Sequence, residues 1–105
     1  MEAGLNDGYI LYIAMEDTVL RINILDHDPE RLFACEQAFN AAIRQLAIKA
    51  VVTQISEPPY LARMNVYDKL PALEIEGLIW SRKSSEAFTK DEAVRFLQRY
   101  CKIGN

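Results

Sequence analysis

The sequence has few residues that bind metals or carry out thiol chemistry. Its 105 residues include two cysteines, Cys35 and Cys101, and a single histidine, His27. Two cysteines so far apart in the sequence form neither a metal-binding knuckle nor a local redox pair. One histidine cannot complete the set of side chains that a zinc site usually requires. The sequence therefore predicts a protein that works without a bound cofactor.

The chain also lacks an excess of basic residues and a long apolar segment. Twelve lysine and arginine residues stand against fifteen aspartate and glutamate residues, which gives a formal net charge of −3. A nucleic-acid groove needs clustered surplus cations, so we expect no nucleic-acid partner. The apolar run at residues 9–15 is too short to span a bilayer, and no positively charged leader precedes it. We expect a cytoplasmic protein that does not bind membranes.

What is present is the composition of one globular domain. Half of the residues are hydrophobic and 26% are charged, which argues against both a disordered chain and a coiled coil. We assign residues 1–17 to an N-terminal extension and residues 18–105 to the domain. Residues 9–15 are apolar throughout and predict an extra strand. That strand would cover an edge of the sheet or pair with its copy in a homodimer.

Strand patterns recur four times after the N-terminal extension. They cover residues 19–25, 50–55, 73–75 and 78–80. The first two strands flank a helix, and a strand–helix–strand unit of this size should be a right-handed parallel crossover. Glu76 and Gly77 predict a tight turn between the last two strands, because glycine accepts a positive φ without steric cost.

Three helices are marked by the residues at their starts. Asp28 can cap a long helix, and Pro29 suits its first position. The apolar residues of this helix recur at helical spacing and predict a buried stripe. The stripe consists of Leu32, Cys35, Phe39, Ala42, Ile43 and Leu46. Pro58 and Pro59 open a short second helix or a turn, and the capping box formed by Thr89 and Glu92 opens the last helix.

The order strand, helix, strand, short helix, hairpin, helix, together with one local motif, resembles the small thioredoxin-like redox-disulfide protein family. The motif is Lys-Leu-Pro-Ala-Leu-Glu-Ile-Glu-Gly at residues 69–77. In that family an apolar residue, a cis-proline, an alternating strand and a glycine turn follow one another in this order. The resemblance implies an α/β fold of the thioredoxin-like kind. This is a three-layer α/β/α sandwich with a central four-stranded mixed sheet, in the order βαβαββα.

The chain departs from this family at the family's redox motif. The family carries Cys-x-x-Cys at the start of the first helix, whereas residues 26–34 of this chain contain no cysteine. Dithiol exchange needs an attacking thiolate at the helix N-terminus and a second thiol one turn later. Asp28 instead places a fixed negative charge at that helix end. We therefore expect no dithiol–disulfide exchange, and the sequence favours binding over catalysis.

The main functional hypothesis is a non-redox protein-interaction module. The resemblance implies that the Leu70-Pro71 loop faces the start of the first helix and that the residue before the cis-proline pairs with an extended peptide. A groove would then lie beside the cis-proline loop and would bind a peptide or a protein partner. Its expected lining residues are His27, Asp28, Pro29, Arg31, Leu70 and Pro71. The alternative interpretation is that the fold needs the proline only for the turn before its third strand.

A second hypothesis makes the protein a thiol-dependent oxidoreductase or peroxidase that uses Cys35 alone. This chemistry would need an exposed thiol with a depressed pKa. The competing interpretation is that Cys35 packs in the core as a small hydrophobic residue. A disulfide between Cys35 and Cys101 is not expected, because the two residues should lie at opposite ends of the fold.

A third hypothesis is a metal or small-ligand site at Asp26, His27 and Asp28. Two carboxylates and an imidazole at a junction between a loop and a helix could hold a metal or transfer a proton. Consecutive residues rarely converge on one point, however. The competing interpretation is that Asp28 caps the helix and that His27 faces solvent.

Overall fold

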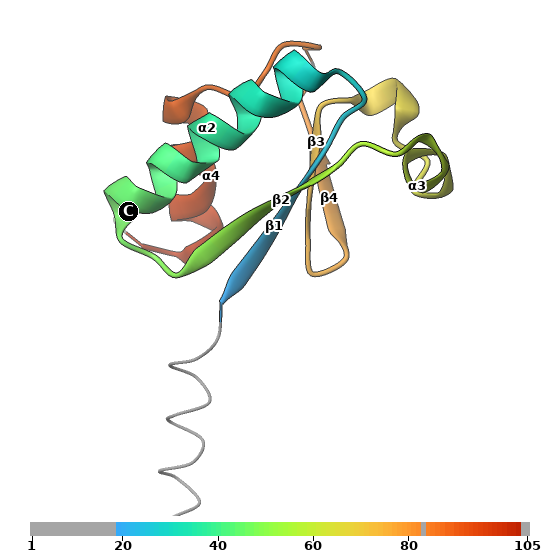
Figure 1. Ribbon diagram of the computed structural model, residues 1–105. Helices are drawn as coiled ribbons and strands as arrows, with labels where there is room; N and C mark the ends of the chain where they lie inside the picture. The colour runs from blue at the N-terminus through green and yellow to red at the C-terminus, as the bar shows by residue number, and fades with distance from the viewer. Residues whose placement is uncertain (1–18, 83, 104–105) are drawn as a thin grey trace, which may run out of the picture.

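The computed structural model of the protein describes residues 19–82 and 84–103 (Figure 1). The expected N-terminal strand at residues 9–15 and the boundary between residues 17 and 18 lie outside the described residues. Within them, the chain forms an α/β fold with a four-stranded mixed sheet and three α-helices. None of these helices is long and apolar enough to cross a membrane.

The sheet is built from two parallel strands and a hairpin. Its strands are β1 (Leu20–Leu25), β2 (Ala50–Ile55), β3 (Ala72–Ile75) and β4 (Leu78–Ser81). They lie in the order β2-β1-β3-β4, with β1 parallel to β2 and the other pairs antiparallel. The predicted strands and the parallel pairing are thus confirmed, and among residues 19–82 and 84–103 β2 and β4 are the outer strands of the sheet.

The helices begin where the sequence predicts. They are α2 (Pro29–Leu46), α3 (Pro58–Arg63) and α4 (Lys90–Cys101), with a short 3-10 helix, η1 (Tyr67–Lys69), after α3. The carboxylate of Asp28 caps α2 by accepting hydrogen bonds from two backbone N–H groups. Thr89 and Glu92 form the expected capping box of α4.

The two long helices cover one face of the sheet, where most of the core lies (Figure 1). Ile22 and Ile24 of β1 point to this face and pack with Phe39 of α2 and Leu97 of α4, all fully buried. The predicted stripe of α2 is confirmed, since four of its six residues are buried and Ile43 and Leu46 are partly buried.

A smaller apolar cluster lies on the other face of the sheet. Because side chains alternate along a strand, Leu25 of β1 and Ala72 of β3 point away from α2 and α4. They pack with Leu61 of α3 and with Val66 and Leu70 from the segment that follows α3. This cluster fixes α3 and η1 at the end of the sheet where β1 and β2 finish, which is also where α2 begins.

Candidate functional site

The expected functional residues lie between the end of β1 and the first turn of α2. Backbone pairing continues one residue beyond β1, since the Asp26 N–H donates to the Ile55 carbonyl at 3.2 Å. At Asp28 the backbone is extended, with φ −95° and ψ 113°, and the helix starts at Pro29. The carboxylate of Asp28 accepts from the N–H groups of Glu30 and Arg31 at 3.0 and 3.3 Å. This cap leaves no free N–H at those two positions for an anionic ligand.

Asp26 is a fully buried carboxylate with a complete set of partners. Its Oδ1 accepts hydrogen bonds from the backbone N–H groups of His27 at 2.8 Å and Asp28 at 3.2 Å. Arg31 donates two hydrogen bonds to the same carboxylate through one edge of its guanidinium, with Nη2–Oδ1 at 2.7 Å and Nε–Oδ2 at 2.5 Å. Burial by itself raises the pKa of Asp26, but the hydrogen bonds and charge of Arg31 and the two backbone donors outweigh it. The net pKa is lower than usual, so Asp26 is ionised at neutral pH.

Arg31 also connects the start of α2 to a distant loop. Its Nη1 donates to the carbonyl of Ser85 at 2.8 Å. Only 20% of the Arg31 side chain is exposed, compared with none of the Asp26 side chain. This pair joins β1, α2 and the loop before α4. This ion pair was not predicted from the sequence, although an aspartate that follows a buried strand and an arginine in the first turn of the next helix are suitably spaced.

The three residues of the possible metal site do not converge. Asp26 is bound by Arg31, and Asp28 is occupied as a helix cap. The exposed ring of His27 stacks on Tyr67 of η1, with ring centroids 5.8 Å apart and an interplanar angle of 29°. Across the described ranges, no three histidine, cysteine, aspartate or glutamate side chains gather as a potential metal site.

A shallow groove lies beside His27, and we call it the α2–β2 groove. One hollow of this groove has His27, Pro29, Leu32 and Phe33 on the α2 side and Gln54 and Ser56 on the β2 side. A neighbouring hollow shares Gln54 and Ser56 and continues to Glu57 and Tyr60 at the start of α3. Three aromatic rings at or next to these hollows are exposed to solvent, Phe33 by 58%, Tyr60 by 50% and Tyr67 by 44%.

Leu70 and Pro71 are placed differently from the expected second wall of the groove. The peptide bond between them is cis. The side chain of Pro71 is fully buried and that of Leu70 is 7% exposed, because Leu70 packs against Leu25 and Leu61. Of the expected lining residues, His27 and Pro29 face the α2–β2 groove, whereas Asp28 and Arg31 are engaged in the cap and the ion pair. Tyr67 is the exposed ring closest in sequence to Leu70.

Both cysteines are free thiols, Cys35 buried and Cys101 partly exposed. Cys35 is fully buried, and its sulfur accepts a hydrogen bond from the Phe88 N–H at 3.4 Å. Burial raises the pKa of the Cys35 thiol, and it also raises the pKa of Cys101. The single-cysteine hypothesis needs an exposed thiol with a lowered pKa, and Cys35 meets neither condition.

The site thus offers binding surface rather than an activated group. Exposed rings, an edge strand and a shallow apolar hollow are suited to contact with an extended polypeptide. No family model matches the chain, and neither a curated protein nor a solved structure matches it.

Proposed function

We propose that the chain is a thioredoxin-like domain that lacks dithiol redox chemistry and works as a peptide-binding module. The element order and the mixed sheet support a three-layer α/β/α arrangement, with α2 and α4 on one face and α3 on the other. The absence of cysteine from residues 26–34 removes the thiols on which disulfide exchange by such a fold depends.

The binding surface in this proposal is the α2–β2 groove, together with the His27–Tyr67 ring pair at its end. The observation that carries the proposal is the exposure of Phe33, a large apolar side chain of which 58% faces solvent at the rim of a hollow. Exposed aromatic residues beside a concave surface are typical anchor points for a partner. The nearby exposed ring of Tyr60 enlarges the apolar area that a partner can cover.

The groove also determines how a partner would lie in it. Because β2 is an edge strand, its outer side offers backbone groups with which an extended peptide can pair. Gln54 and Ser56 at the end of β2 line the groove, so a paired peptide would pass directly over the hollow beside Phe33. One side chain of the peptide would fill that hollow.

Acidic side chains lie at both ends of this surface, and the guanidinium of Arg63 lies over the Tyr60 ring, 5.4 Å from its centroid. Asp28 and Glu30 lie at the start of α2, and Glu57 lines the hollow next to Tyr60. Arg31 does not compensate them, because Asp26 already holds its guanidinium. We therefore expect a partner segment with an apolar anchor and at least one lysine or arginine, because opposite charges favour docking and select against acidic competitors.

Selection of peptides from a displayed random library against the immobilised protein tests this function. Enriched peptides, synthesised with a fluorophore, are titrated by polarisation against the wild type and two variants. Phe33→Asp should weaken binding by about tenfold or more, as expected for an interface anchor. Leu78→Asp is a matched control, because Leu78 is 59% exposed on β4 and does not line the groove. Equal affinity of both variants, or a failure to enrich any peptide, would refute the proposal.

A further inference from the structure

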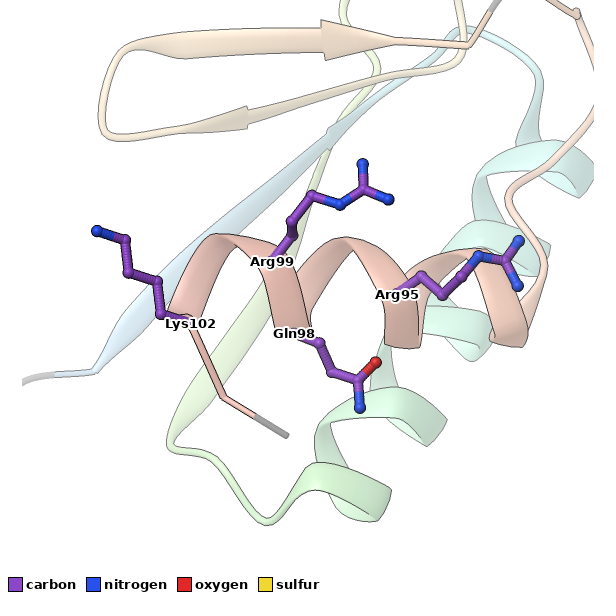
Figure 2. A pocket seen from close by; sticks show the side chains of 4 residues that line it. All are labelled: Arg95, Gln98, Arg99 and Lys102. Carbon is purple, nitrogen blue, oxygen red and sulfur yellow. The ribbon is translucent and has the colours of Figure 1, made fainter. Parts of the chain in front are cut away.

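A second surface, away from the α2–β2 groove, is formed by the outer side of α4. Arg95, Gln98, Arg99 and Lys102 line a shallow hollow there, and Figure 2 shows their side chains extending from α4, with Arg99 between Arg95 and Lys102. Throughout residues 19–82 and 84–103, no acidic side chain forms an ion pair with any of these three cations. The surface is therefore a cluster of uncompensated positive charge on a protein with a net charge of −3.

An apolar area adjoins these cations. Arg99 also lines a neighbouring hollow, together with Trp80 of β4 and with Phe96 and Tyr100 of α4. The indole of Trp80 packs edge-on against the other two rings, at centroid distances of 5.1 and 5.5 Å. Leu78, on the same side of β4 as Trp80, is 59% exposed. We call the two hollows and Leu78 the α4–β4 surface. It combines basic residues with an apolar area beside the edge strand β4.

The chain itself contains a segment with the complementary chemistry. Residues 1–18 hold four acidic residues and no lysine or arginine, so all twelve basic residues of the protein lie after residue 18. The acidic residues flank the apolar run at residues 9–15, with Asp7 before it and Glu16 and Asp17 after it. An apolar centre with acidic flanks matches an apolar area beside three cations.

The position of Val19 allows the acidic and apolar segment before it to reach the α4–β4 surface. Val19 and Glu76 line one hollow, and the Tyr100 hydroxyl donates to the Glu76 carboxylate at 2.6 Å. The chain thus joins β1 at the end of the sheet where Tyr100, in the last turn of α4, reaches Glu76, two residues after Asp17. An extended run of seven residues spans up to about 25 Å, and a helix of α4's length spans about 18 Å, so residues 9–15 can run along the whole of α4.

We infer that residues 7–17 bind the α4–β4 surface of the same chain. Glu16 and Asp17 would lie near Lys102 and Arg99, the apolar run would cover Trp80 and Leu78, and Asp7 would reach Arg95. This site is separate from the α2–β2 groove, so the inference does not depend on the proposed peptide-binding function.

Carbodiimide cross-linking of the full-length protein tests this inference, because the reagent joins only an amine and a carboxylate in direct contact. The expected product is a link between Lys102 and Glu16 or Asp17, identified by mass spectrometry. A one-to-one mixture of light and isotopically heavy protein shows whether the link lies within one chain. Links that join a light to a heavy chain would assign the surface to a second copy and overturn the inference.

Charge-reversal variants separate docking from mere proximity along the chain. Arg95→Glu with Arg99→Glu should reduce the yield of this cross-link severalfold and increase acrylamide quenching of Trp80, the single tryptophan. Arg44→Glu with Arg63→Glu, both exposed on other helices, is the matched control and should change neither readout. If the two double variants give the same cross-link yield and the same quenching as the wild type, residues 7–17 do not dock on α4.

Discussion

Substitution of Arg31 by methionine should destabilise the protein by about 3 kcal/mol at neutral pH. The variant keeps Asp26 fully buried but removes the two hydrogen bonds and the charge that compensate its carboxylate. Removing one partner of a buried ion pair typically costs about 3–5 kcal/mol. We expect the lower end of this range, because 20% of the Arg31 side chain is exposed and water can reach the site when the side chain is shortened.

The loss should depend on pH in a defined direction. In the wild type the pKa of Asp26 is lowered, so its contribution to stability is present above the usual value of 3.8 and is lost as the pH falls through the lowered pKa. In Arg31→Met, burial is opposed only by two backbone donors, and the pKa of Asp26 should rise above its usual value. The folded variant then prefers a protonated carboxyl, so the difference in stability from the wild type should shrink as the pH falls.

Urea denaturation followed by Trp80 fluorescence measures both effects, with titrations at neutral pH and in acid. Arg82→Met is the comparison for pH dependence, because Glu92 is 32% exposed whereas Asp26 is fully buried. Arg82 also donates to the carbonyls of Glu86 and Ala87, so the size of its loss is not compared. Its loss should change little with pH, because the variant leaves no fully buried carboxylate without a partner. A loss below about 1 kcal/mol for Arg31→Met, or an equal loss in acid and at neutral pH, would refute the stabilising role of the buried pair.

Three further predictions concern single groups. Cys35 should react with iodoacetamide much more slowly than Cys101 in the native protein and equally fast in urea, because only Cys35 is fully buried; equal native rates by mass spectrometry would contradict this. Thr89→Ala should cost about 1 kcal/mol in urea denaturation, because it removes the cap of α4, and an unchanged midpoint would show that the cap is unimportant. One of the five tyrosines should ionise at about pH 12 in an ultraviolet titration, because a hydrogen bond to Glu76 raises the pKa of Tyr100 to about 12. Glu76→Gln should lower that value, and a titration without any such late tyrosine would be the contrary result.

The features that the sequence predicted correctly are determined by residues close together along the chain. The start of α2 depends on Asp28 and Pro29, and the start of α4 depends on Thr89 and Glu92, each within a single helical turn. The alternation of apolar and polar residues is equally local, and it predicted the four strands. These elements needed no knowledge of what packs against them.

The features that the sequence left open depend on distant segments. In the ion pair of Asp26 and Arg31, the arginine also donates a hydrogen bond to the carbonyl of Ser85. The burial of the pair therefore depends on the packing of three separate segments. Leu70 was predicted to line the groove, because no residue near it in the sequence indicates that it packs against Leu61. Phe33 did offer a signal, since it is a large apolar residue next to the buried stripe of α2 rather than on it.

The buried ion pair between Asp26 and Arg31 also has a consequence for how the protein responds to heat. The cost of removing charged groups from water falls as temperature rises, whereas the stabilisation from apolar burial levels off. The connection that Arg31 makes between β1, α2 and the loop at Ser85 therefore carries a growing share of the remaining stability on heating. The end of the fold that holds the α2–β2 groove should keep its shape to a higher temperature than the β3–β4 turn, where residues 76–79 are exposed.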